Sequence, residues 1–497
     1  MTKKISKILI ANRGEIANRV MRTCDEMGIK TVAIYADNDS TLSYVSEASE
    51  SYGLGSGELS ETYLNIDKII NIVKDSGAEA IHPGYGFLSE NSGFRQRCED
   101  EGIVFIGPSS EAMDLMGDKQ ASKLALEKSG APLIPGYHGD NQDSEFLKKE
   151  AVKIGFPVLI KATAGGGGKG MRIVNNEKDF IEALSGAKSE ALKSFSNDNV
   201  LLEKFIETPR HIEVQVVGDS HGNVLHFFER ECSIQRRYQK IIEETPSPAL
   251  NDDLRTRICQ AGVDIAKSIS YENAGTIEFI LDSNGDFFFL EMNTRLQVEH
   301  PITEMVTGVD LVKLQIQAAQ GEKLNLVQSE ITQKGHAIEC RIYAENADEN
   351  FMPSVGTIKK MGNSSRQGVR WDASFQEGDE VTINYDPMIG KLVTYANNRE
   401  ACINKMNITL NEMFILGFKT NHNYLLRILK HPKFLAGDID TLFIEKYGEE
   451  LKQKTANSVK IAEIIARFEL AGTTKNQMTK YEKSNPWTDL GEWRIDS

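Results

Sequence analysis

The stretch PVLIKATAGGGGKGMRIV, residues 157–174, decides the fold of the central part of this 497-residue chain. Its apolar ends, 157–163 and 171–174, are typical of β-strands, and four consecutive glycines lie between them. Without Cβ atoms, successive backbone N–H groups can turn toward an anion, so the run is either a phosphate cradle or a flexible surface loop. A P-loop is excluded, because it needs a following helix and a Ser or Thr after Lys169.

Downstream, the stretch GTIEFILDSNGDFFFLEMNTRLQVEHP, residues 275–301, predicts a β-hairpin that turns at Asn284-Gly285. A two-residue type I′ turn would place Ile280 opposite Phe289 and Glu278 opposite Glu291. Like charges directly opposite on paired strands destabilise a sheet. The arrangement therefore needs an explanation unless the hairpin is merely exposed and its acidic residues are independent.

A divalent cation would explain the pairing. Asn293 lies two residues beyond Glu291 and so points to the same face. Carboxylate and amide oxygens suit Mg²⁺ or Mn²⁺. The sequence therefore predicts a metal site made by Glu278, Glu291 and Asn293.

Polar residues alternate just after this hairpin, in TRLQVEHP. Arg295 offers a planar fork for an anion, Gln297 an amide and Glu299 a possible base. They would converge if the segment stays extended, whereas His300, before a proline, is equally explained as a turn residue. Alone the triplet is weak evidence, and the neighbouring metal hairpin strengthens it.

Basic residues gather in a chain that is acidic overall. A solvated face is the usual explanation of such runs, and the alternative is an electropositive wall around phosphates and a small anion. The basic residues in question are Lys119, Lys161, Lys169, Arg230, Arg236, Arg237, Lys240 and Arg341.

The first ~110 residues alternate between strand and helix. Strands are predicted at 7–12, 30–37, 78–84 and 102–108, with intervening helices such as the one at 66–77. This rhythm predicts a parallel, Rossmann-like sheet. The stretch ANRGEIA, and not GxGxxG, follows the first strand, so no dinucleotide is predicted.

Composition excludes several classes of protein. The net charge of −15 argues against a nucleic-acid surface, and no apolar run approaches the ~20 residues of a membrane span. The N-terminus lacks the features of a signal peptide, so a cytoplasmic enzyme is expected. Six scattered cysteines without a CxxC pair predict buried thiols and no zinc site or disulfide framework.

Taken together, these motifs resemble the biotin carboxylase family of the ATP-grasp superfamily. The resemblance covers about residues 5–447 and rests on KILIANRGEIA, HPGYGFLSENSGF, FIGPSSEAMDLMGDK, VLIKATAGGGGKGMR, EKFIETPRHIEVQV, QRRYQK, EMNTRLQVEHP, HAIECRIYAE and YDPMIGKLV. It implies an α/β and α+β multidomain fold. The domains it implies are a Rossmann-like N-terminal domain (1–115), an ATP-grasp domain (116–334) with a mobile glycine-rich lid (about 133–206), a C-terminal domain (335–447) and a C-terminal extension (448–497).

The resemblance also implies a reaction. ATP phosphorylates bicarbonate to carboxyphosphate, which releases CO₂ beside biotin, and the biotin N1′ is carboxylated. The implied ATP-binding residues are Lys119, Lys161, Gly165, Gly166, Gly167, Gly168, Glu203, Lys204, Ile206, His211 and Gln235. On this basis the glycine run is a lid over ATP, and Glu278, Glu291 and Asn293 hold two Mg²⁺ or Mn²⁺ ions.

The same resemblance implies the catalytic centre. Glu299 is the expected base that deprotonates bicarbonate, and Arg341 would stabilise the biotin enolate. Lys240 and Arg295 complete the catalytic set. The implied bicarbonate and biotin site comprises Lys240, Arg295, Gln297, Val298, Tyr85, Gly86 and Arg341.

Two features depart from the family. Position 238 is Tyr where many relatives carry His, and no AMKM-type biotinylation sequence occurs. Biotin is therefore expected on a separate carrier protein, with a carboxyltransferase subunit as a further partner and a homodimer as the expected assembly. The extension from about 448 is a candidate for docking a partner.

Alternatives remain at this level. Acetyl-CoA or propionyl-CoA is the expected final acceptor, with pyruvate or another 2-oxoacid next. Another ATP-grasp ligase would share the metal carboxylates but not TRLQVEHP together with CRIYAE. A non-catalytic nucleotide-binding subunit would not need Glu278, Glu291, Arg295, Glu299 and Arg341 together.

Overall fold

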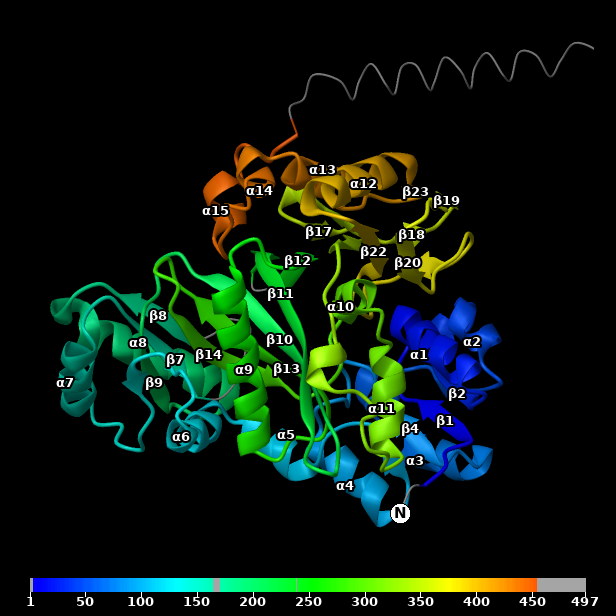
Figure 1. Ribbon diagram of the computed structural model, residues 1–497, viewed down its shortest axis with the longest axis horizontal. Helices are drawn as coiled ribbons and strands as arrows, with labels where there is room; N and C mark the ends of the chain where they lie inside the picture. The colour runs from blue at the N-terminus through cyan, green and yellow to red at the C-terminus, as the bar shows by residue number, and fades with distance from the viewer. Residues whose placement is uncertain (1–2, 164–169, 238, 454–497) are drawn as a thin grey trace, which may run out of the picture. The chain divides into compact units, whose positions relative to one another are not determined.

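The structure, a computed structural model, describes residues 3–163, 170–237 and 239–453 (Figure 1). Within the described residues, positions 3–451 form one compact unit. The glycines Gly165–Gly168, Tyr238 and residues 454–497 of the expected extension lie outside the described residues.

The N-terminal part is built on a parallel five-stranded sheet. Its order is β3-β2-β1-β4-β5, that is Glu50–Gly55, Lys30–Ala36, Lys7–Ile10, Ala80–His82 and Val104–Phe105. This confirms the Rossmann-like prediction. Strand β3 was not predicted, since ESYGLG combines polar residues with two glycines.

Local signals set the helices that connect these strands. Helix α3 (Ile66–Ser76) begins where the Asn65 side chain accepts a hydrogen bond from the backbone N–H of Lys68. It ends at Gly77, whose φ of 66° is a left-handed conformation that glycine adopts without strain. Helices α1 (Gly14–Glu26) and α4 (Ser92–Asp100) also lie where the sequence predicted helix.

The glycine stretch has the strand–loop–strand form that the sequence predicted. Strands β7 (Val158–Ala162) and β8 (Met171–Val174) are antiparallel, and Lys161 pairs with Met171 across the glycine run. The small sheet has the order β6-β9-β7-β8, with β6 at Gly136–Tyr137 and β9 at Val200–Lys204. Helices α7 (Ser144–Ile154) and α8 (Phe180–Phe195) lie beside these strands (Figure 1).

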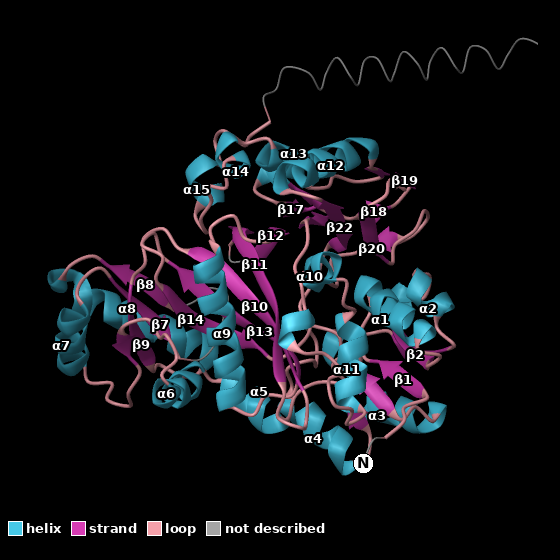
Figure 2. Ribbon diagram, viewed as in Figure 1, coloured by secondary structure: helices cyan, strands magenta, loops and turns pink. Residues whose placement is uncertain are grey.

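An antiparallel eight-stranded sheet forms the largest element of the fold. Its order is β14-β13-β10-β11-β12-β15-β22-β20, that is Phe287–Asn293, Asn273–Leu281, Arg210–Gly218, Val224–Arg236, Gln239–Thr245, His336–Tyr343, Met388–Ala396 and Val369–Ala373. Helix α9 (Asp252–Ser268) packs against β10 and β11 (Figure 2). The sheet continues across residue 335, so strands from both sides of that position share one hydrogen-bonded surface.

The predicted hairpin forms, but its turn is one residue longer than predicted. Ile280 pairs with Phe288 and not with Phe289, because Asp282 N–H donates to the Asp286 carbonyl oxygen and leaves three residues in the turn between them, where Gly285 takes a φ of 87°. A bulge then shifts the register between Glu278 and Phe279, which restores the pairing of Glu278 with Glu291. The predicted carboxylate pair is therefore correct, although the predicted register near the turn is wrong.

The surroundings of the cysteines and the character of the helices can be compared with what the composition predicted. All six cysteines are free and buried, as predicted. Across the described ranges, none of the helices combines the length and apolar character that crossing a bilayer requires.

The close approach at Gly218 gives a stability test. A Cβ at this position would lie 2.0 Å from the backbone oxygen of Tyr271, which cannot move aside as a side-chain tip would. We expect Gly218→Ala to lower the free energy of unfolding by about 1–3 kcal/mol, measured from the urea midpoint. Gly117→Ala is the matched control, because nothing lies within 4 Å of its added Cβ. Equal midpoints for the two variants would contradict this packing.

Candidate active site

A cavity of about 1420 Å³ lies between the small sheet and the large sheet. It exceeds the ~300–1,000 Å³ of most single-ligand pockets, so it has room for more than one reactant. It brings together most of the site residues predicted from the sequence. These are Lys119, Lys161, Glu203, Lys204, Ile206, His211, Gln235, Lys240, Glu278, Glu291, Asn293, Arg295, Gln297, Val298, Glu299 and Arg341.

Glu299 lies at the centre of the charged part of this cavity. Its carboxylate accepts hydrogen bonds from Lys240 Nζ at 2.7 Å and from Arg341 Nη2 at 2.9 Å. The side chain is 1% exposed and precedes helix α10 (His300–Thr307), which fixes its backbone. Burial alone would raise the pKa of Glu299, but Lys240 and Arg341 outweigh it and hold that pKa well below its usual range.

Lys240 joins three carboxylates, two on strands β10 and β13 and the third just before helix α10. Its Nζ donates to Glu213 at 2.5 Å, to Glu278 at 2.9 Å and to Glu299 at 2.7 Å. Burial would lower the pKa of Lys240, but the charges of Glu213, Glu278 and Glu299 raise it well above its usual range. A permanently charged ammonium at this point can receive an anion if one carboxylate moves away.

The predicted metal residues have the chemistry that a divalent cation requires. Glu278 and Glu291 face each other across β13 and β14, and Asn293 Nδ2 donates to Glu278 Oε1 at 2.8 Å. Enclosure by the protein, and then the charge of Glu278, raise the pKa of Glu291. A hard cation between two carboxylates and an amide oxygen would relieve this repulsion, so the residues fit Mg²⁺ or Mn²⁺.

Two lysines, Lys119 and Lys161, line the cavity near Glu291. Lys161 on β7 donates to Glu203 Oε2 on β9 at 3.1 Å, and Lys123 on helix α6 (Lys119–Ser129) forms an ion pair with the other Glu203 oxygen. Burial, and then repulsion from Lys119, lower the pKa of Lys161 to about 8. Lysines held close together in this way suit a polyanion such as a chain of phosphates.

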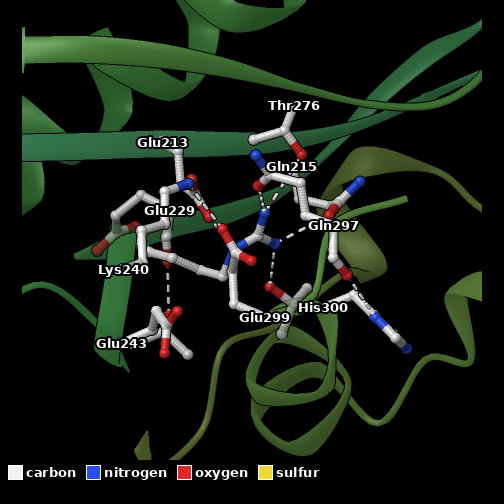
Figure 3. Close-up of polar contacts among 12 residues, drawn as sticks. Glu213, Gln215, Glu229, Lys240, Glu243, Thr276, Gln297, Glu299 and His300 are labelled. Atoms are coloured by element: carbon white, nitrogen blue, oxygen red, sulfur yellow. Dashed lines mark hydrogen bonds and ion pairs between the residues drawn. The ribbon is translucent and has the colours of Figure 1, made fainter. Parts of the chain in front are cut away.

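Arg230 belongs to this centre, although the sequence left open whether it lies on a solvated face or in an electropositive wall. It is fully buried, and its guanidinium donates to Glu213, Gln215 and Thr276, and also to Gln297 at 2.8 Å (Figure 3). These contacts link β10, β11 and β13 to the segment that carries Glu299. No local signal distinguishes Arg230 from the exposed arginines nearby, because its partners are distant in sequence.

A residue from the N-terminal part of the chain, Glu90, holds the side chain of Arg295 in place. Its Nε donates to Glu90 Oε2 at 2.9 Å, and its Nη2 donates to Asn293 Oδ1 at 3.0 Å. Glu90 lies within HPGYGFLSEN and was not singled out from the sequence. Its pairing with Arg295 joins the loop after β4 to the cavity.

Tyr85 and Gly86 do not belong to the described lining of the cavity. The Asn12 side chain donates to the Tyr85 carbonyl oxygen at 2.8 Å, and Gly86 takes a φ of 65°. Lys391 Nζ lies 5.7 Å from the centre of the Tyr85 ring. The loop is thus held in place near the site, and its predicted contact with biotin stays a prediction.

Comparison with known proteins identifies the family. The model of the biotin carboxylase N-terminal domain matches residues 4–113, and that of the C-terminal domain matches 339–446. The ATP-binding domain of the carbamoyl-phosphate synthase L chain matches 118–327. The chain belongs to the biotin carboxylase family.

Individual relatives agree with this assignment. Biotin carboxylase of Nostoc sp. is 48% identical over 90% of this chain and all of its own length. The mitochondrial methylcrotonoyl-CoA carboxylase subunit alpha of Dictyostelium discoideum is 49% identical over 99% of this chain. A crystal structure of a biotin carboxylase–βγ-ATP complex from Campylobacter jejuni superimposes with a TM-score of 0.86, at 47% identity, over 89% of this chain and 99% of that one.

The match to the longer family members is partial. The chain spans between 61% and 71% of the length of the methylcrotonoyl-CoA carboxylase alpha subunits that it resembles. Their substrates and partners therefore do not transfer to this chain without further evidence.

The lowered pKa of Lys161 gives a pH test of anion binding. Below about pH 8 its ammonium is charged, and above that pH it loses the proton and its attraction for phosphate. We expect the Kd for Mg·ADP to rise about tenfold between pH 7.5 and 9.5, which corresponds to ~1.4 kcal/mol. Titration calorimetry measures this change.

Lys161→Arg is the matched control, because arginine stays charged over the whole range. We expect the rise in Kd to be largely absent in this variant. The same pH dependence in both proteins would show that another group titrates.

Proposed function

We propose that the chain carboxylates biotin on a carrier protein, using ATP and bicarbonate, as the first half-reaction of an acyl-CoA carboxylase. One observation carries the proposal. A buried carboxylate, Glu299, lies between Lys240 and Arg341 in the same cavity as a carboxylate pair suited to a metal and a group of lysines suited to phosphates. The proposed base, the pocket for the small anion and the pocket for the phosphates therefore lie in the same cavity.

In the first step, bicarbonate occupies the pocket of Lys240, Arg295, Gln297 and Val298. Glu299 accepts the bicarbonate proton, and the oxygen that loses it attacks the γ-phosphorus of ATP. The bond from that phosphorus to the β–γ bridging oxygen breaks, its electron pair leaves with ADP, and carboxyphosphate forms. Catalysis at phosphorus is mainly positioning and charge neutralisation, which the cavity's cations supply.

In the second step, carboxyphosphate separates into CO₂ and phosphate. Biotin N1′ loses a proton to the phosphate, which is the strongest base at hand, and a new N–C bond forms with CO₂. Arg341 would stabilise the enolate oxygen that carries the charge of deprotonated biotin. Its guanidinium is buried between Glu243 and Glu299, so little reorganisation is needed.

The nucleotide would lie across the small sheet and the large sheet. In this proposal Lys119 and Lys161 contact phosphates, Glu203, Lys204 and Ile206 surround the adenine, and His211 lies near the ribose, with Gln235 nearby. Divalent ions held by Glu278, Glu291 and Asn293 would neutralise phosphate charge. Lys204 Nζ donates to two loop carbonyls, of Gly155 and Phe156, which supports a fixed wall at this end.

The organisation and partners are part of the same proposal. We infer an N-terminal domain to residue 115, an ATP-grasp domain over 116–334 with a lid at about 133–206, and a C-terminal domain over 335–447. A biotin carrier and a carboxyltransferase would complete the enzyme, with a homodimer as the assembly. The acceptor is an acyl-CoA, with methylcrotonoyl-CoA added to acetyl-CoA and propionyl-CoA as a candidate, and pyruvate or another 2-oxoacid is the alternative.

The cellular location expected from the sequence, the cytoplasm, stays a prediction. The relatives of longer length include mitochondrial proteins. Localisation of a tagged full-length chain in its own cells would decide between the two.

The test of function is ADP release by the purified chain with Mg²⁺ and bicarbonate, with and without free biotin. We expect biotin to stimulate turnover and Glu299→Gln to reduce the stimulated rate by at least about 100-fold, because an amide cannot accept the proton. Glu229→Gln is the control, since Glu229 is equally buried but binds Ser247 and Arg255 outside the cavity.

Each result has a distinct meaning. A rate of ADP release that is the same with and without biotin would indicate another ATP-grasp ligase. A Glu299→Gln variant as active as the wild type would remove Glu299 from the role of base.

A further inference from the structure

Two buried carboxyl groups, outside the lining of the cavity, lie near Arg341. Glu243 on β12 and Glu339 on β15 are directly paired in the antiparallel register, and both are 0% exposed. Directly opposed like charges destabilise a sheet, and here no solvent screens them. Neither residue lines the cavity, and the proposed mechanism uses neither.

The two carboxyl groups, Glu243 and Glu339, differ in their hydrogen bonds. Glu243 Oε1 accepts from Arg341 Nε at 2.6 Å, which marks Glu243 as the ionised member. Both oxygens of Glu339 are buried and have no hydrogen-bond partner among the described residues. An ionised carboxylate in that position would be a bare charge in a low-dielectric interior, which is costly.

The cations near Glu339 are already committed elsewhere. Lys391 on β22 is fully buried, and its Nζ lies 2.9 Å from the Val298 carbonyl oxygen and 3.0 Å from Glu15 Oε2. Arg341 binds Glu243 and Glu299. The two cations thus face four carboxyl groups, and a proton on one carboxyl reduces the excess negative charge.

The titration behaviour agrees with the contacts. Burial, opposed by Lys391 and increased by Glu243, raises the pKa of Glu339 well above its usual range. Burial likewise raises the pKa of Glu243 to about 7, although Arg341 opposes the shift. The hydrogen bond from Arg341 stabilises the charged form of Glu243, and Glu339 has none, so the contacts make Glu339 the member that keeps its proton.

We propose that Glu339 is a positioning residue for the carboxylation, which carries a proton at neutral pH and thereby leaves Arg341 held between Glu243 and Glu299. The inference rests on the proposed function for its catalytic meaning. When Glu339 loses its proton, a second negative charge appears near Arg341, on β15 and directly opposite Glu243. The guanidinium is then drawn toward β12 and β15, away from the oxygen that it stabilises.

The groups that face Glu339 are limited and define the test. They are Glu243 from β12, Arg341 from its own strand, Lys391 from β22 and Glu299 from the segment before α10. Against the effect of burial, the charges of Glu243 and Glu299 raise the pKa of Arg341, so its guanidinium stays charged over the pH range of interest, and Glu299 is ionised throughout. Glu243 and Lys161 have pKa values of about 7 and about 8, so only the difference between the wild type and Glu339→Gln is assigned to Glu339.

The first readout does not depend on activity. Infrared difference spectra of the full chain at pH 7.5, wild type minus Glu339→Gln, should show the C=O stretch of a protonated carboxylic acid. Glutamine keeps the size of the side chain and its neutral state, so this variant should fold. Absence of the band would show Glu339 to be ionised and would overturn the proposal.

The second readout is the pH profile of kcat for biotin-dependent ADP release, with ATP, bicarbonate and biotin saturating. We expect Glu339→Gln to keep kcat at pH 7.5 within about twofold, and to lose much less activity than the wild type by pH 9.5. For the wild type we expect a loss of at least about fivefold over that range. An unchanged alkaline limb in Glu339→Gln would overturn the positioning role.

Glu244→Gln is the matched control. Glu244 is the neighbouring buried carboxylate on β12, but it is satisfied by His336 and Arg399. We expect this variant to lose stability and to keep the wild-type alkaline limb, so an equal shift in both variants would reject the proposal. If the wild type shows no response to biotin, the proposed function and the positioning role both fail, while the infrared band still reports the proton on Glu339.

Discussion

The structure depends on neutralising a set of carboxylates that are buried on one face of the large sheet. Glu213, Glu278 and Glu299 come from separate parts of the chain and share Lys240. Removing one partner of such a group leaves an unpaired buried charge, which costs about 3–5 kcal/mol. The strands that carry these residues are thus held in register by charge as well as by backbone hydrogen bonds.

This constraint explains why one continuous sheet supports residues from two expected domains. Arg341 and Lys391 lie on β15 and β22, whereas Glu278 and Lys240 lie on β13 and β12. Adjacent strands fix side chains more tightly than a domain interface would, because every step along the ladder is hydrogen-bonded. A site that must place a base, a cation and a phosphate pocket within one cavity benefits from this common surface.

Sequence patterns predicted the parts of this site that depend on local order. The strand–glycine–strand unit and the pairing of Glu278 with Glu291 follow from residues within a few positions of each other. The turn length was wrong because Asn284-Gly285 is compatible with both two- and three-residue loops, and a bulge cancelled the error. Roles inferred for individual residues came from the resemblance to a family and are still predictions.

Contacts between residues far apart in the chain could not be predicted from the sequence. Arg230 looked like one basic residue among several, yet it is fully buried and contacts Thr303, 73 positions away. Glu90 reaches Arg295 across 205 positions. Periodicity and composition indicate which secondary structure an isolated segment prefers. The roles of Arg230 and Glu90 depend on contacts that form only when distant segments pack together.

The same charge balance constrains when Glu299 can act. Bound to Lys240 and Arg341, it is ionised but a weak base, since its pKa is held well below its usual range. An anion that takes its place on Lys240 removes one of the cations that depress this pKa, so the basicity of Glu299, the proposed base, rises as the substrate binds. In this arrangement the substrate itself activates the base, and Arg341 must then stay in place while Lys240 changes partner. A neutral Glu339 near Arg341 meets that requirement, because it adds no second charge to that of Glu243 in competition for the guanidinium.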